Sequence, residues 1–183
     1  MIAIIKKLHL YGLHRRICFF LINYIFVGTG RFFFAAKRVV MRLSGNPVGE
    51  GTKIVGKIRI YGTVSIGKNC WINRGFTVHG NGNVHIGNNC DIAPDVIFLT
   101  GSHKIGNKER RAGNGETFSI KIGNGCWIGA RATLLRNIIV NDGSVVAACA
   151  CVTKDVPENT LVAGVPAKII RRLDVENIEP PEE

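Results

Sequence analysis

One histidine of this chain stands where acid–base chemistry is plausible. His103 lies in Gly-Ser-His, inside a polar stretch at residues 99–119 that interrupts an otherwise regular apolar pattern. Imidazole has an unperturbed pKa of about 6.5, so it is largely neutral at cytoplasmic pH and can accept a proton. Long polar excursions from a rigid scaffold usually carry function. We therefore select His103 as the candidate catalytic residue, over the alternative of a loop histidine exposed by chance.

The cysteines offer no comparable site. None forms a C-x-x-C pair, and a disulfide framework is typical of small secreted domains with thin cores, which this chain is not. We expect reduced, buried cysteines in a cytoplasmic protein. They are Cys18, Cys70, Cys90, Cys126, Cys149 and Cys151.

A six-residue repeat in the sequence predicts the scaffold that positions His103 and the cysteines. Aliphatic residues recur six apart, with a two-residue slip near residues 80–83 and a break before residue 122, and Phe98 is the one aromatic member. A helix repeats at 3.6 and a strand at two, so a period of six indicates short strands joined by corners. The repeat positions are Ile54, Ile60, Ile66, Ile72, Val78, Ile86, Ile92, Phe98, Ile122, Ile128, Leu134, Val140, Val146 and Val152.

Three such strands close a triangular coil of eighteen residues with a stacked aliphatic interior, which is a solenoid. Small or medium groups four residues after each aliphatic, including Cys70, Cys90 and Cys126, are predicted to stack inside. Corners at residues 67–69, 87–89, 123–125 and 141–143 combine Gly, Asn and Asp, which tolerate positive φ. The fold class expected is all-β: a parallel β-helix at residues 46–157 with an excursion loop at 99–120.

Both ends depart from the repeat. Residues 1–45 form a basic, aromatic-rich arm with eight bases and no acid, which leaves a net charge of only +3 for the rest of a chain that carries +11 in total. We expect helices that pack on the domain body and no nucleic-acid binding. The alternative is peripheral contact with an anionic membrane, because the apolar run Ile17–Val27 is too short for a span. Residues 158–183 are expected to close the fold with a short helix before an acidic tail.

Three segments carry a family resemblance. They are Gly125-Cys-Trp-Ile-Gly129, Val152-Thr-Lys-Asp-Val-Pro157 and Ala163-Gly-Val-Pro-Ala-Lys168. Together they resemble the hexapeptide-repeat acyltransferases, nearest to galactoside and maltose O-acetyltransferases and to relatives that acetylate capsular and exopolysaccharide sugars. The resemblance covers roughly residues 54–173 and implies a left-handed β-helix, an acetyl-CoA co-substrate and a homotrimer with sites between neighbours.

The resemblance also implies roles for individual residues. His103 matches the general base, and backbone groups of Ala130 and Ala148 match the wall that holds the pantetheine arm, with the Ala130 amide as a candidate oxyanion donor. The positions near the nucleotide and phosphates match Thr153, Lys154, Lys168 and Arg171. On the acceptor side Asn73 matches a sugar-binding asparagine, although Asn is also a common corner residue. Asn81 stands where galactoside and maltose enzymes carry an aspartate, and Trp127 is a further acceptor candidate.

Two departures from the family pattern affect the donor groove. Arg136-Asn137 stands where Pro-Gly is usual, and Cys149 occupies a glycine corner. A metal site is the alternative, because γ-type carbonic anhydrases share this solenoid and His79, His85 and His103 could supply three ligands. We predict no metal, since the excursion lacks the second histidine used by that family.

The activity expected is acetyl transfer from acetyl-CoA to a sugar or polysaccharide hydroxyl, in a ternary complex in the cytoplasm. N-acetylation of an amino sugar and O-acetylation of serine are alternatives on the same fold. An alternative of another class is a non-catalytic scaffold in membrane-bound polysaccharide assembly.

Overall fold

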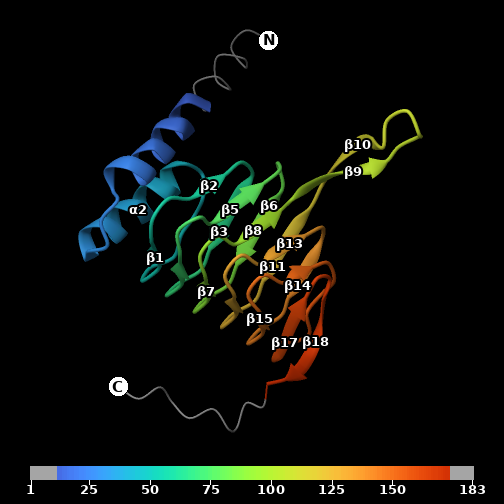
Figure 1. Ribbon diagram of the computed structural model, residues 1–183. Coiled ribbons are helices and arrows are strands. Elements are labelled where there is room, and N and C mark those ends of the chain that lie inside the picture. The colour runs from blue at the N-terminus through green and yellow to red at the C-terminus, as the bar shows by residue number, and fades with distance from the viewer. Residues whose placement is uncertain (1–11, 174–183) are drawn as a thin grey trace.

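A computed structural model of the protein describes residues 12–173, and its body is a left-handed parallel β-helix of three sheets (Figure 1). Each coil contributes a short strand to sheet I, then to sheet II, then to sheet III. Sheet I contains β1 (Lys53–Ile54), β4 (Trp71–Ile72), β7 (Asp91–Ile92), β12 (Trp127–Ile128), β15 (Val145–Val146), β17 (Thr160–Gly164) and β18 (Ala167–Arg172). Sheet II contains β2 (Arg59–Ile60), β5 (Thr77–His79), β8 (Ile97–Leu99), β13 (Thr133–Leu135) and β16 (Cys151–Val152). Sheet III contains β3 (Thr63–Ile66), β6 (Asn83–Ile86), β11 (Ser119–Ile122) and β14 (Ile138–Val140).

The six-residue repeat builds the core as predicted. Every repeat position named above is buried, and residues of successive coils stand in parallel register, as Ile72, Ile92 and Ile128 do in sheet I. The corners adopt the expected left-handed conformation, with φ of 55° at Asn69 and at Asn89, and 63° at Gly125. The prism is therefore held by one continuous stack of aliphatic side chains.

Three cysteines serve as coil-to-coil links at one inner corner. The thiol of Cys70 donates to the carbonyl of Gly87 at 3.1 Å, and that of Cys90 donates to the carbonyl of Gly123 at 3.0 Å. The Cys126 side chain and burial raise the pKa of Cys90 to about 11. All three thiols are buried and bond backbone carbonyls of a neighbouring coil, so they are structural groups, as the spacing predicted.

The basic arm covers the open end of the prism. Residues 12–20 are helical and continue as the π-helix η1 (Leu21–Ile25), and α2 (Arg31–Leu43) follows. The first coil has no coil beneath it, so its carbonyl groups need other donors. The arm supplies them: Lys37 bonds the carbonyl of Ile54 at 2.9 Å, and the side-chain amide of Asn23 bonds both the N–H and the C=O of Ile58.

Further arm cations act in the same way. Arg38 donates to the carbonyl of Thr52, Arg42 to that of Val48, and Arg15 to those of Ile60 and Gly62. The positive charge of the arm is thus largely committed to the edge of the first coil. Within residues 12–173, no helix combines the length and the apolar character needed to cross a bilayer.

The expected C-terminal helix is wrong. Residues Ala167–Arg172 form β18, which pairs antiparallel with β17 and completes sheet I. The last coil offers an unpaired strand edge, and pairing satisfies the backbone groups of β17, which a helix at this position would leave open. The acidic tail lies outside the described residues.

Candidate functional site

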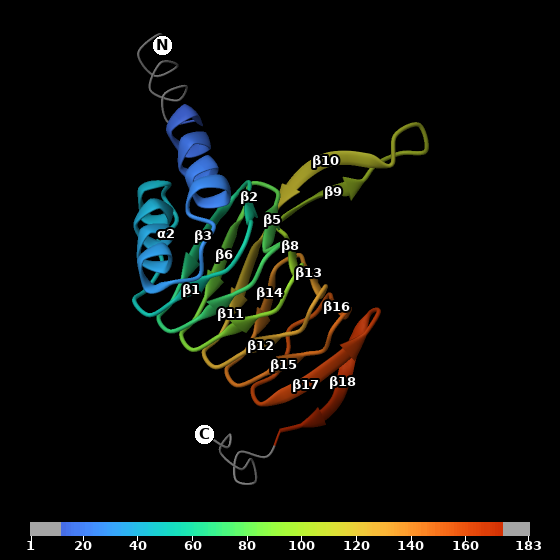
Figure 2. The same cartoon turned by 60° about the vertical axis from the view of Figure 1, so that its left-hand side comes forward.

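The excursion from the prism is a β-hairpin where an irregular loop was expected (Figure 2). Its strands are β9 (Gly101–Ile105) and β10 (Ala112–Thr117), paired antiparallel with His103 opposite Gly115. The hairpin leaves where two glycine backbones cross: a Cβ on Gly80 would lie 2.5 Å from the amide nitrogen of Gly101. A paired hairpin holds its side chains more firmly than a free loop does.

His103 is exposed on β9 and is held by one backbone contact. Its Nδ1 lies 2.8 Å from the carbonyl oxygen of Gly113. A carbonyl can only accept, so Nδ1 carries the proton and Nε2 keeps a free lone pair. The imidazole is thereby fixed in the tautomer required of a base. Sequence reasoning missed Gly113, because its contact depends on a register shift between Ala112 and Gly115.

A hollow of about 460 Å³ lies beside this imidazole. The structure brings Asn81 into it, as a lining residue together with His103. Glu116, which is half-buried, and Thr117 line the same hollow from β10. A small polar acceptor would therefore meet an imidazole, an amide, a carboxylate and a hydroxyl within one space.

The predicted donor wall lies at the edge between sheets I and II. Ala130 and Ala148 follow the paired strands β12 and β15 and stack in adjacent coils. Within residues 12–173 neither backbone N–H of these two alanines has a backbone acceptor. A Cβ on Gly129 would lie 2.5 Å from the amide nitrogen of Ala148, so the coils approach closely here. Two free amides on a smooth wall suit a narrow pantetheine arm.

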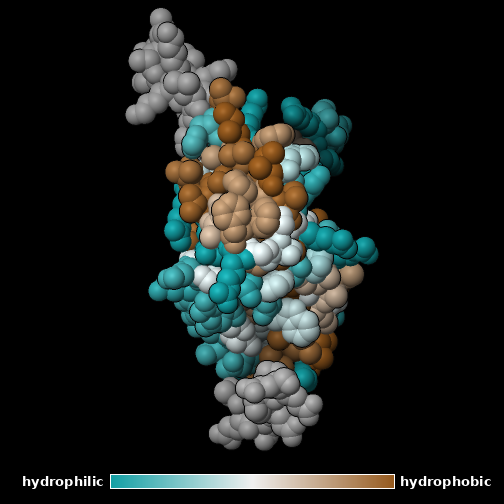
Figure 3. All heavy atoms as spheres, turned by 90° about the vertical axis from the view of Figure 1, so that its left-hand side faces the viewer, coloured by the Kyte–Doolittle hydropathy of each residue, from teal (hydrophilic) through white to brown (hydrophobic). Residues whose placement is uncertain are grey.

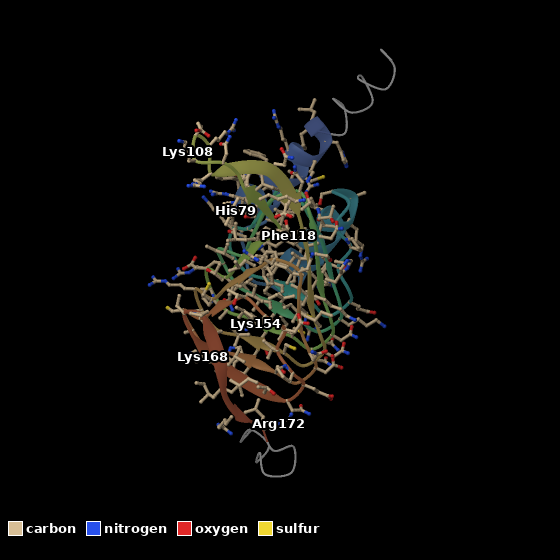
Figure 4. All side chains as sticks on the ribbon, turned by 90° about the vertical axis from the view of Figure 1, so that its right-hand side faces the viewer. His79, Lys108, Phe118, Lys154, Lys168 and Arg172 are labelled. Carbon is tan, nitrogen blue, oxygen red and sulfur yellow. The ribbon has the colours of Figure 1, made fainter. Side chains whose placement is uncertain are left out.

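The residues predicted to contact the phosphates and nucleotide of acetyl-CoA lie on two other parts of the prism. Lys154 is exposed and follows β16, where the chain turns from sheet II to sheet III, and Thr153 beside it is half-buried. Lys168 and Arg171 are exposed on β18 in sheet I. Figure 4 shows Lys154 and Lys168 on the coils far from Lys108, which marks the hairpin.

The candidate residues thus occupy two edges of one sheet. His103 and Asn81 lie where the chain passes from sheet II to sheet III, whereas Ala130 and Ala148 lie where it passes from sheet I to sheet II. Sheet II separates the base from the donor wall within one chain. A single chain therefore does not bring the two halves of the predicted site together.

The remaining acceptor candidates do not join His103 either. Asn73 follows β4 at the edge between sheets I and II, the edge that carries Ala130. Trp127 points outward from β12 and is 57% exposed. Both lie on the donor side of sheet II, away from the hollow beside His103.

The two departures from the family pattern are accommodated by unusual backbone. Arg136 has φ of 72° and Cys149 has φ of 61°, so each non-glycine residue holds a left-handed corner. Cys149 is exposed and Cys151 is half-buried, which corrects the expectation that all cysteines are buried. The reason is geometric: Cys149 at a corner and Cys151 at the outward position of β16 point out of the prism, while the residues four after each aliphatic point in.

The other histidines have structural partners. His79 stacks on Tyr61 with ring centroids 5.5 Å apart, and Nδ1 of His85 lies 2.8 Å from the Ser65 hydroxyl. His14 bonds the carbonyl of Leu43, the last residue of α2. His9 lies outside the described residues. No group of three or more His, Cys, Asp or Glu side chains within residues 12–173 is placed to hold a metal ion.

Comparisons with known proteins find relatives that are named acetyltransferases. The family described as "Bacterial transferase hexapeptide (six repeats)" matches residues 119–154. The galactoside O-acetyltransferase of Escherichia coli is 36% identical over 115 residues, which are 62% of this chain and 57% of the relative. The chain thus spans a little over half the length of this curated relative.

Solved structures extend the likeness over most of the chain. A hexapeptide-repeat acetyltransferase of Vibrio cholerae, complexed with acetyl coenzyme A, has a TM-score of 0.79 and 25% identity, covering 92% of this chain and 90% of that one. A galactoside acetyltransferase in complex with coenzyme A has a TM-score of 0.76 and 28% identity, covering 92% of this chain and 84% of that one.

Proposed function

From the likeness of this chain to hexapeptide-repeat acetyltransferases, we propose that it transfers the acetyl group of acetyl-CoA to a sugar hydroxyl. The observation that carries the proposal is the imidazole of His103. Its Nδ1 is held by the carbonyl of Gly113, which leaves Nε2 to act as the base, and His103 lines a hollow together with Asn81. Names of relatives support the reaction class, and the site geometry supports His103 as the proposed base.

The reaction needs one base, one oxyanion site and no covalent enzyme intermediate. Nε2 of His103 accepts the hydroxyl proton while the sugar oxygen attacks the thioester carbon. The carbonyl oxygen of the thioester becomes negative in the tetrahedral intermediate, and the free N–H of Ala130 is proposed to stabilise it. When the carbon–sulfur bond breaks, the CoA thiolate leaves and takes the proton back from His103.

The donor would lie along the wall of Ala130 and Ala148. Backbone groups of these residues are proposed to hold the pantetheine arm, while Thr153 and Lys154 approach the phosphates. Lys168 and Arg171 would contact the nucleotide end as charge-assisted donors. Acceptor contacts are proposed for Asn81, and for Asn73 and Trp127 across an assembled interface.

We propose a homotrimer in which each site combines two chains. The support is the separation noted above: the base and Asn81 lie on one edge of sheet II, and the donor wall lies on its other edge. Packing prisms side by side would place the sheet II–III edge of one chain against the sheet I–II edge of its neighbour. Closed cyclic assemblies repeat such a heterologous contact identically around the ring.

Mutation of the base tests the chemistry. We expect His103→Ala to lower kcat by about two to four orders of magnitude, because a positioned general base contributes about that much. Binding of CoA, measured by calorimetry, should be unchanged. His85→Ala is the matched control, since His85 is exposed on sheet III and bonds only Ser65. Near-normal turnover of His103→Ala would remove this residue from the mechanism.

Mixed assemblies test whether two chains share the site. His103→Ala lacks the base, and Ala148→Trp blocks the donor wall, so each variant alone should be inactive. Refolding the two variants together creates interfaces that pair an intact base with an intact wall, and part of the activity should return. If each site lay within one chain, the mixture would stay inactive.

Two further measurements separate the remaining alternatives. A panel of acceptors with acetyl-CoA, containing galactosides, an amino sugar and serine, distinguishes O-acetylation of sugars from the alternative transfers. Calorimetry that detected no CoA binding would favour a scaffold. We propose a cytoplasmic location, where acetyl-CoA is made available by metabolism.

A further inference from the structure

The arm carries an apolar stripe that the prism leaves uncovered. Leu13, Ile17, Phe20 and Tyr24 are spaced four, three and four apart, so they lie on one side of the helical segment. Each is between 50% and 58% exposed, and the rings of Phe20 and Tyr24 stack at 5.3 Å. We call these four residues the outer stripe. Figure 3 shows apolar surface gathered at the arm end of this face of the molecule.

The stripe is not needed to hold the arm in place. The opposite side of the same segment packs on the prism through Cys18 and Ile22, which are buried, and through the paired side chain of Asn23. α2 adds further apolar surface, since Phe32 is 69% exposed. Each large apolar side chain is much better buried than left in water. A helix that is apolar on both sides therefore has a second surface to cover.

Positive charge surrounds this apolar surface. A hollow of about 850 Å³ between the arm and sheet II lies beside the stripe and shares Tyr24 with it. Four cations line the hollow against a single acid, Asp95; they are Arg15, Arg16, Lys57 and Arg59. The ammonium of Lys57 lies 4.4 Å from the ring centre of Tyr24. Glu50 is the first acid of the chain, so the arm brings no negative charge to this face.

We propose that the outer stripe is a docking surface for an anionic lipid membrane. Aromatic and aliphatic side chains would enter the headgroup–acyl boundary, and the neighbouring cations would contact anionic headgroups, with the helix lying in the plane of the interface. A second copy of the chain fits less well, because like faces would bring two sets of uncompensated cations together. The membrane contact is independent of the acetyl transfer proposed above.

Vesicle flotation of the full chain tests the assignment. The wild-type protein should float with phosphatidylcholine vesicles that contain phosphatidylglycerol and much less with phosphatidylcholine alone. Ile17→Glu with Phe20→Glu should lower the bound fraction on anionic vesicles at least about tenfold, since two apolar anchors become acids. Arg16→Glu with Lys57→Glu should weaken binding to anionic vesicles and leave the small neutral-vesicle fraction unchanged.

The matched control carries the same charge change at the other end of the prism. Val165 and Ile170, on the C-terminal hairpin, are exposed to a similar or greater degree, and Val165→Glu with Ile170→Glu should float like the wild type. Urea unfolding and solution mass show whether each variant keeps its fold and assembly. Equal flotation of the stripe variant and the wild type would overturn the proposal. So would failure of the wild type to float, or a loss of subunits specific to the stripe variant, which would make the stripe a subunit contact.

Discussion

The hydrogen bonds of Asn23 in the arm predict that its replacement destabilises the first coil. Its side-chain amide donates to the carbonyl of Ile58 at 2.9 Å and accepts from the N–H of Ile58 at 2.9 Å, as a neighbouring strand would. Ile58 is 4% exposed. The change Asn23→Ala leaves both backbone groups of Ile58 without these partners. The first coil should lose stability for that reason alone.

The size of the loss follows from the surroundings. A buried polar group left unpaired costs about 1–3 kcal/mol, so two such groups bracket the effect at about 2–6 kcal/mol. Asn23 and Ile58 both line the open hollow beneath the arm, and water can enter from it. We therefore expect the low end, about 2 kcal/mol of unfolding free energy. For a domain of this size that corresponds to a fall in Tm of about 4–8 °C.

Urea unfolding of the full chain measures this loss, and amide hydrogen exchange locates it. The midpoint should fall with the denaturant slope unchanged, and the amide of Ile58 should lose protection. Asn23→Asp keeps the acceptor for the Ile58 N–H and loses the donor, so it should fall between wild type and alanine at high salt. Asn114→Ala, on the exposed hairpin, should leave the midpoint in place. An unchanged midpoint in Asn23→Ala would refute the idea that the arm replaces a missing coil.

Two other side chains give predictions of different kinds. Cys149 is the exposed cysteine of the described chain, so Ellman's reagent should modify it fastest in the native protein; acetyl-CoA should slow the reaction if Ala148 belongs to the donor wall, and Cys149→Gly should abolish the fast phase. Desolvation lowers the pKa of Lys37, so below the unfolded value of about 10.4 the unfolded chain binds more protons than the folded one, and stability should rise with pH through that window. The urea midpoint of the wild type, measured relative to that of Lys37→Met, should therefore rise as the pH is raised through the alkaline range. A constant difference would contradict the buried ammonium.

The arm illustrates how a solenoid can end without a special capping repeat. Four cations of the arm bond carbonyl groups of the first coil, as Lys37 does with Ile54, while the outer stripe on the opposite side of the arm stays exposed. At the other end a backbone strand, β18, performs the same task for β17. Both solutions satisfy an open sheet edge, one through side chains and one through the backbone.

The sequence by itself determined the prism. A period of six leaves the chain few ways to bury Ile72, Ile92 and Ile128 together. Residues such as Asn69 predict left-handed corners, because few residue types accept positive φ. These features depend on neighbours along the chain or one coil away. The position of His103 in a break of the repeat was visible for the same reason.

Only the tertiary structure decided how the ends and the site are completed. The carbonyl that orients His103 comes from Gly113 across a hairpin with an irregular register, and the partner of Asn23 lies thirty-five residues away. The segment of β18 forms a strand because it pairs with the otherwise unpaired edge of β17, although its residues also suit a helix. Local spacing carries no signal for such contacts, since each depends on which unpaired groups the finished prism presents.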